Sequence, residues 1–406
     1  MRTWTLLTVL ASAGVGACGS PKATPSASAV ASVETPPSAS SEAPVEPPPP
    51  PPPAGPGATK FITADEAKCH LASIEVAQYL SRGELALATT PTEIALGWLV
   101  QGQGDAKIGV GAFDGQAKRV MRDRSIADTK THGPVLYAGK DDWIVTWFEE
   151  DGLAFARTRK EPDNHYDIGK FSMMRDVPLD DLAIAQTPDG SFVAASPFAT
   201  GGKQLTVFTF SSSPTSATKQ SVGMTRSGTT PHNPVVAADA DGFLLVWVES
   251  SSQLRSVRLD AAGKSSGGAS TLLGPAKRTG LSLLGAEDGF YLTWSEGPLI
   301  AAVKLTKDGT VAAPPIKIGE GKWARPAVSG ADLFVAYVIE GDKLVVVKAR
   351  GGAAPTSGVV VADVAKDPPM LGISGSRLAT FSTEPIHQAV ATKRAMLRTV
   401  DVACIP

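Results

Sequence analysis

A short pattern recurs along most of this chain and constrains its fold more than any other feature. It reads DGFLLVWVE at residues 241–249 and DGFYLTWSE at residues 288–296. In each copy a turn residue leads into a strand of alternating apolar residues that carries an aromatic side chain and ends near a glutamate. The aligned aromatic position falls at Trp98, Trp147, Ser196, Trp247, Trp294, Tyr337 and Phe381, at intervals of 43 to 51 residues.

Each copy lies between further strand-like segments. A short apolar stretch, often introduced by proline as at Pro134, precedes the copy, and a second alternating stretch such as the one from Leu254 follows it. A fourth, weaker segment completes the unit, for example from Gly358. Four strands in about 40–50 residues is the size of one β-propeller blade. Residues 69–404 therefore resemble β-propeller repeat proteins, and we predict an all-β fold, a single seven-bladed β-propeller of four-stranded blades.

The recurring aromatic side chain has a structural role in this fold. Side chains alternate across a strand, so one face of each blade packs against its neighbour. A bulky ring at that contact buries roughly 150–250 Å². We therefore expect the aromatic residues to hold the blades together rather than to bind a ligand; Ser196 is the one interruption of the pattern.

The last blade lacks a fourth strand, because the chain ends at Pro406 soon after its third. The segment from Leu71 to Tyr79 is apolar and belongs to no blade of its own, so we predict that it supplies the missing outer strand. Cys69 and Cys404 would then meet, and exported proteins commonly form disulfides. In the chain-entropy model such a bridge adds on the order of 4–5 kcal/mol.

The start of the predicted propeller carries a helix-capping signal. Thr63 and Glu66 have capping-box spacing ahead of Ala67. A short helical turn over residues 64–68 is compatible with the predicted outer strand.

The N-terminus has the features of an export signal. Arg2 precedes a short apolar stretch, residues 4–15, which is shorter than the ~20 residues that a membrane-spanning helix needs. The sequence Val15-Gly16-Ala17-Cys18 that follows resembles the lipobox of bacterial lipoproteins. The resemblance implies a signal peptide at residues 1–17, lipidation of Cys18 and a place in the cell envelope. Because no aspartate follows Cys18, it also favours the outer membrane, at the periplasmic face or the cell surface.

Residues 18–60 have the composition of a tether. They are rich in Pro, Ala and Ser and contain an unbroken proline run from Pro47 to Pro53. A segment with so few bulky apolar residues is expected to be disordered, with its proline run extended. The predicted organisation is signal peptide 1–17, lipidated cysteine and tether 18–60, and propeller 61–406.

Composition and motifs argue against several function classes. The formal net charge of -2 gives no electrostatic footprint for nucleic acid. The sequence has no His-Glu-x-x-His and no phosphate-binding glycine loop. We predict no metal and no cofactor, and interpret Asp239-Ala-Asp241-Gly, which resembles the start of a calcium loop, as a polar turn. We expect Glu249 and Glu296, at hairpin ends, to be solvated.

Unusual side chains gather where the links between blades enter the innermost strands. They share the position at one mouth of the predicted central channel, and the set is net cationic: Arg82, His132, Asp181, His232, Arg278, Trp323, Arg325 and Lys366. Converging polar groups at a concave mouth are typical of a binding site. His132, Asp181, His232, Arg278, Trp323 and Arg325 are the candidate ligand-binding residues, for an anionic group on a glycan, a peptide or a lipid.

Besides a purely structural surface protein without a ligand, two functions remain open on these observations. The first is a non-catalytic binding or scaffolding lipoprotein of the bacterial cell envelope, anchored to the membrane through Cys18, with the propeller as an interaction platform for a protein, peptide or glycan. The second is an envelope or extracellular carbohydrate-active enzyme with its site at the channel mouth. The second needs two carboxylates ~5–9.5 Å apart, and among the mouth residues above the sequence supplies only Asp181.

Overall fold

The computed structural model describes most of the chain beyond residue 58. The described residues are 59–80, 84–101, 106–129, 132–138, 142–149, 152–160, 166–168, 172–175, 182–188, 190–197, 205–211, 218–222, 229–250, 252–364, 366–386 and 392–406. The predicted signal peptide, Cys18 and the tether up to residue 58 lie outside them. Among the described residues there is no helix with the length and hydrophobicity of a membrane span.

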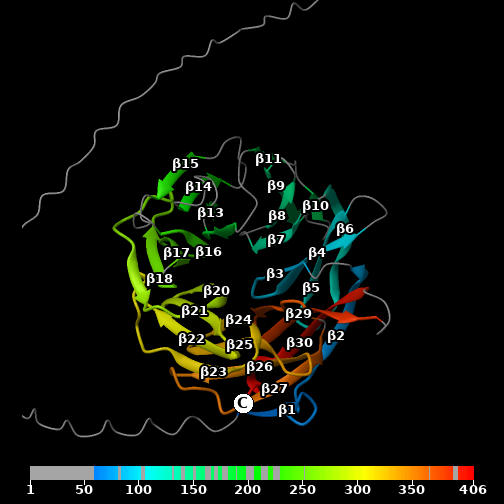
Figure 1. The fold of residues 1–406 in the computed structure, drawn as a ribbon. Coiled ribbons are helices and arrows are strands. Elements are labelled where there is room, and N and C mark those ends of the chain that lie inside the picture. Colours follow the sequence, from blue (N-terminus) through cyan, green and yellow to red (C-terminus); the bar gives the residue numbers. More distant parts are fainter. Residues whose placement is uncertain are drawn as a thin grey trace, which may run out of the picture. The chain divides into compact units, whose positions relative to one another are not determined.

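Seven β-sheets form a closed ring around a central channel (Figure 1). Written from the innermost to the outermost strand, the first three blades are β3 (Leu85–Thr89), β4 (Glu93–Gln101), β5 (Ala106–Asp114), β6 (Arg119–Thr129); β7 (His132–Ala138), β8 (Asp142–Glu149), β9 (Gly152–Lys160), β10 (Tyr166–Ile168); and β12 (Ala183–Gln186), β13 (Ser191–Ser196), β14 (Leu205–Ser211), β15 (Thr218–Val222). The predicted all-β, seven-bladed propeller of four-stranded blades is confirmed.

The remaining four blades follow in chain order. They are β16 (Pro231–Asp239), β17 (Gly242–Glu249), β18 (Leu254–Leu259), β19 (Ser270–Leu273); β20 (Thr279–Ala286), β21 (Gly289–Glu296), β22 (Leu299–Leu305), β23 (Ile316–Glu320); β24 (Lys322–Ser329), β25 (Asp332–Ile339), β26 (Lys343–Arg350), β27 (Ser357–Asp363); and β28 (Met370–Ser374), β29 (Arg377–Pro385), β30 (Lys393–Asp401), β2 (Ala72–Leu80).

The recurring aromatic position lies on the second strand of every blade and is buried in all seven. Trp147, Trp247 and Tyr337 have no exposed surface, and Ser196, which replaces the ring in the third blade, is equally buried. The core is a series of layers between blades: Val246 and Val248 of β17 pack in one cluster with Phe290 and Trp294 of β21. The predicted structural role of the aromatic residues is therefore confirmed.

The ring closes as the sequence predicts. Strand β2 pairs antiparallel with β30 and completes the seventh blade. Next to this pairing, a disulfide joins Cys69 to Cys404 across 335 residues, with 5.4 Å between the Cα atoms. Arg377 adds hydrogen bonds to the carbonyl oxygens of Gly115 in the first blade and of His70. The two ends of the propeller are therefore joined covalently and by buried hydrogen bonds.

Two strands extend the four-stranded pattern. Strand β1 (Lys60–Thr63) pairs parallel with β27 on the outer edge of the sixth blade, and β11 (Ser172–Arg175) pairs with β9 in the second. Between β1 and β2 the backbone makes one hydrogen-bonded turn, in which the Glu66 carboxylate accepts from the Thr63 amide and the Thr63 hydroxyl accepts from the Glu66 amide. This is the capping box that the spacing predicts.

Candidate functional site

The inner strands share a distortion where the links between blades enter the channel, at what we call the link mouth. The position is held by His132, Thr279 and Lys322, the first residues of β7, β20 and β24, and by His232, the second residue of β16. Each pairs with the residue after the buried aromatic position, and each is followed by a β-bulge. His132 and His232 therefore occupy equivalent positions, as predicted. β-bulges re-aim side chains at the rims of such structures.

In three of these strands, β16, β20 and β24, the residue that follows the paired position takes a left-handed backbone conformation. The φ angles are 49° at Asn233, 60° at Gly280 and 62° at Trp323. Glycine and asparagine tolerate this conformation, whereas a bulky side chain is strained in it. Trp323 is held there by packing against the core between the sixth and seventh blades, and the Lys322 ammonium lies 4.3 Å from the centre of its ring. Strain of this kind is concentrated at functional sites.

Arg325 follows this bulge and is the exceptional residue of the mouth. It pairs with Ala336, the residue before Tyr337. The seven residues that pair in this way, one from each blade, are Ala86, Val135, Ala183, Val235, Ser282, Arg325 and Leu371. Arg325 alone among them is charged, so one cation stands in an otherwise neutral ring.

The Arg325 guanidinium has no hydrogen bond, ion pair or ring contact with any described residue. The side chain is half-buried, and its nitrogen atoms are not sealed from solvent. Loss of hydration lowers the pKa of Arg325 from its usual value, yet a guanidinium remains protonated in proteins. An uncompensated charge that is partly desolvated is costly in the empty protein and attracts an anion.

Two of the other predicted residues have partners within the protein. The Arg278 guanidinium donates to the carbonyl oxygen of Gly274 at 2.7 Å, lies 3.9 Å from the Glu296 carboxylate and covers the Trp294 ring. Burial lowers the pKa of Arg278, and Glu296 opposes that effect. His232 is half-buried, with Nδ1 3.4 Å from the carbonyl oxygen of Thr230. The Arg278 side chain therefore stabilises the link between blades in which it lies.

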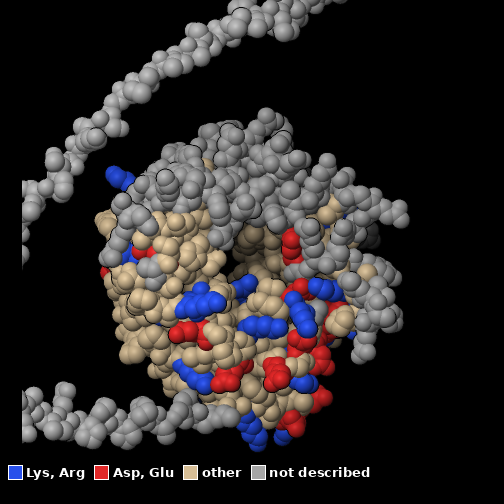
Figure 2. Space-filling model, in the orientation of Figure 1, with Lys and Arg blue, Asp and Glu red and all other residues tan. Residues whose placement is uncertain are grey.

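The remaining predicted positions are less fully described. Asp181 and Arg82 lie outside the described residues, and for His132 only the backbone is described. Lys366 is exposed in the link to β28. On the face shown in Figure 2, Lys and Arg side chains gather around the central hollow, with Asp and Glu side chains among them.

The described acidic side chains at the link mouth are engaged within the protein. Glu84 accepts a hydrogen bond from the Gly133 amide, and Asp367 accepts from Lys393 at 2.7 Å. Glu249 is fully buried, with its Oε1 atom 3.5 Å from Nε of Arg255, so the prediction that it is solvated was wrong. The Glu296 side chain is 45% exposed, as predicted. Glu249 is buried beside Arg255 of the adjacent strand β18, on the face of β17 that carries Trp247, which the sequence of one strand does not reveal.

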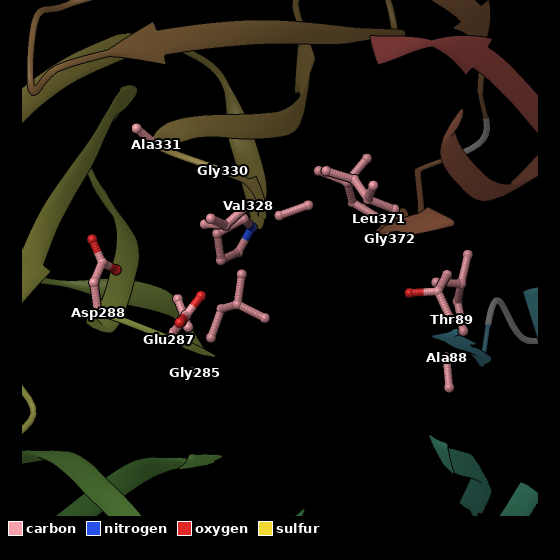
Figure 3. A pocket seen from close by; sticks show the side chains of 16 residues that line it. Ala88, Thr89, Gly285, Glu287, Asp288, Val328, Gly330, Ala331, Leu371 and Gly372 are labelled. Carbon is pink, nitrogen blue, oxygen red and sulfur yellow. The ribbon is translucent and has the colours of Figure 1, made fainter. Parts of the chain in front are cut away.

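The other half of the channel is an open cavity that sequence reasoning missed. It has a volume of about 840 Å³ and lies among the ends of β3, β20, β24 and β28 (Figure 3). Its walls are mainly aliphatic: Leu87, Ala88, Leu284, Ala286, Pro326, Ala327, Val328, Leu371 and Ile373. Glu287 and Asp288 lie at its edge in the turn after β20.

Comparisons with known proteins agree on shape and leave function open. No family model matches the chain, and no curated protein matches it. Among solved structures, the Myceliophteria thermophila Cps50 (Swd1) β-propeller domain is 12% identical, with a TM-score of 0.49 over 79% of this chain and 99% of that one. The WD40 domain of Toxoplasma gondii coronin is 11% identical, with a TM-score of 0.47 over 85% and 89%.

A third similar structure comes from a bacterium. A putative 6-phosphogluconolactonase from Bacteroides fragilis is 13% identical, with a TM-score of 0.47 over 73% of this chain and 92% of that one. Similarity at this level concerns the fold, and the same fold serves many functions. The function of this chain is therefore argued from its own residues.

Proposed function

We propose that this chain is a non-catalytic binding lipoprotein of the bacterial cell envelope, which holds an anion-bearing ligand at the link mouth of its propeller. The observation that carries the proposal is Arg325, a partly desolvated guanidinium with no partner among the described residues. A fold retains such a group at a loss of stability, and functional sites are where proteins tolerate that loss.

The architecture supports a binding platform. A propeller closed by a disulfide and by the β2–β30 pairing presents four of the mouth residues, His132, His232, Trp323 and Arg325, on strands rather than on loops. Sites built on strands hold their geometry more closely than sites on loops. The lipobox at Cys18 and the tether suit a domain held at a distance from a membrane.

An enzyme acting on carbohydrate is less well supported at this mouth. Such an enzyme needs one carboxyl group free to donate a proton and a second free to act as base or nucleophile. Glu84, Glu249 and Asp367 each have an amide or a cation beside them. These contacts favour a structural role for the three carboxylates over a catalytic one.

The membrane part of the proposal is tested by mass spectrometry of the mature protein and by fractionation of cells. We expect an acylated N-terminal Cys18 in the membrane fraction, and release of the protein from that fraction in a Cys18→Ala variant. An unmodified Cys18 in the mature protein would refute the anchor.

The binding part is tested by photo-cross-linking in intact cells, with wild type compared with Arg325→Met. Arg350→Met is the matched control, because it removes an arginine from the same blade whose side chain is 74% exposed. We expect cross-linked species that are lost in Arg325→Met and kept in Arg350→Met. Equal cross-linking in all three proteins would place the interaction elsewhere on the propeller or on the tether.

A further inference from the structure

We propose that the ligand is a long-chain carboxylate, with its head on Arg325 at the link mouth and its apolar tail in the aliphatic cavity of the channel. This inference rests on the proposed function, since it assigns a chemical class to the ligand of the same mouth. It joins two features that the sequence does not connect, the unpaired guanidinium and the 840 Å³ cavity.

The strand register places the head group at the end of the cavity. Leu371 occupies in β28 the position that Arg325 occupies in β24, because each pairs with the residue before the buried aromatic position. Leu371 also lines the cavity. Ala327, two residues beyond Arg325 on the same face of β24, lines it too, and two residues of strand span ~7 Å. The Arg325 side chain therefore leaves strand β24 at the end of the cavity that is nearest to the link mouth.

The side chains that line the cavity favour a ligand with an apolar tail. Aliphatic side chains make up most of the lining, and the polar side chains along it are Thr89, Glu287 and Asp288. A sugar chain placed there would meet few polar side chains, so most of its hydroxyl groups would depend on backbone groups or water for hydrogen bonds. A hydrocarbon tail has no such groups, and the volume lies within the roughly 300–1,000 Å³ of small-molecule sites.

The charges at the two ends of the cavity fix the direction of the ligand. Arg325 supplies a positive charge at the link end, whereas Glu287 and Asp288 lie at the opposite end. Asp288 is paired with Lys304, and Glu287 is exposed. An anionic head is attracted to the first end and repelled from the second. Among the described mouth residues Arg325 is the one guanidinium without a partner, which matches a monoanion, and its planar fork fits a carboxylate.

The test is isothermal titration calorimetry on the full chain carrying Cys18→Ser, with octanoate, decanoate, dodecanoate and hexadecanoate as probes. We expect affinity to rise about fourfold for each methylene group until the cavity is filled, the gain expected from burying one methylene. Acetate, which has the head alone, should show no measurable binding. Affinity that does not depend on chain length would overturn the inference.

Variants of the site separate the head from the tail. In Arg325→Met we expect carboxylate affinity to fall at least tenfold while hexadecanol, which lacks the charge, binds as before; Arg350→Met should match wild type. In Leu284→Glu, which places a carboxylate on the cavity wall, all probes should bind more weakly. Unchanged hexadecanoate affinity in Arg325→Met, or tighter binding of hexadecyl phosphate than of hexadecanoate by more than tenfold, would overturn the carboxylate assignment.

Failure of this inference can be told apart from failure of the proposed function. If cross-linking in cells depends on Arg325 while no fatty acid binds, the mouth binds an anion of another class and only the inference fails. If cross-linking does not depend on Arg325, the proposed function fails as well.

Discussion

Cys69 and Cys404 lie 335 residues apart in the sequence and 5.4 Å apart between their Cα atoms. The bridge connects the segment before β2 to the 3-10 turn after β30, the two strands whose pairing closes the ring. The same blade thus contains the first and the last part of the propeller. Its stability depends on keeping together two ends that the unfolded chain would separate widely.

Removing this bridge should lower the stability of the propeller. We expect the double variant Cys69→Ser, Cys404→Ser to lose about 5 kcal/mol of unfolding free energy, because its unfolded chain is no longer constrained. Urea unfolding followed by tryptophan fluorescence measures the loss. Wild type in reducing agent should match the variant, and identical midpoints for oxidised wild type and the variant would contradict the prediction.

The aromatic packing in the first blade should be sensitive to one methyl group. A Cβ at Gly109 would lie 2.4 Å from the Trp98 ring, so Gly109→Ala should destabilise the fold by about 1–3 kcal/mol through overpacking. Gly267→Ala is the control, since a Cβ there meets nothing within 4 Å, and its effect should stay within about 0.5 kcal/mol. Chemical denaturation measures the unfolding free energy of both variants. Equal losses in the two variants would mean that the Trp98 ring shifts to make room for the added methyl group.

Arg325→Met should separate stability from binding. The unpaired guanidinium gains nothing from described neighbours, so an apolar side chain of similar length should leave the unfolding free energy unchanged or raise it by about 1 kcal/mol. The same variant should lose the ligand. A loss of more than 1 kcal/mol in urea unfolding would show that Arg325 is structural.

The capping turn before β2 should respond to acid. Hydrogen bonds from the Thr63 amide and hydroxyl lower the pKa of Glu66. A carboxyl group whose pKa is lower in the folded protein stabilises the fold above its unfolded pKa, and this contribution is lost as the pH falls through the folded pKa. Thr63→Ala should raise the pKa of Glu66 towards its ordinary value, as followed by NMR of labelled glutamate carboxyl carbons. Thr306→Ala is the control, and an unchanged Glu66 pKa in Thr63→Ala would argue against the turn.

Much of the fold was readable from the chain because a propeller repeats itself along the sequence. The position of Trp247 within its pattern predicts its strand, and seven such patterns predict seven blades. Closure followed from counting: the last repeat lacked a strand and the residues from Leu71 were unassigned. These inferences depend only on order and period along the chain, and pairing within one blade is local in sequence.

The site depended on contacts between blades, which the period does not encode. The sequence placed Arg325 at the mouth, but only the tertiary structure shows that it lacks the partner that Arg278 finds in Glu296. Glu249 was expected in solvent and is buried beside Arg255. Strand β1 joins β27 from nearly 300 residues away. The sequence by itself determined which strands form and in what order, whereas burial, ion pairing and the cavity were decided by how the blades pack against one another.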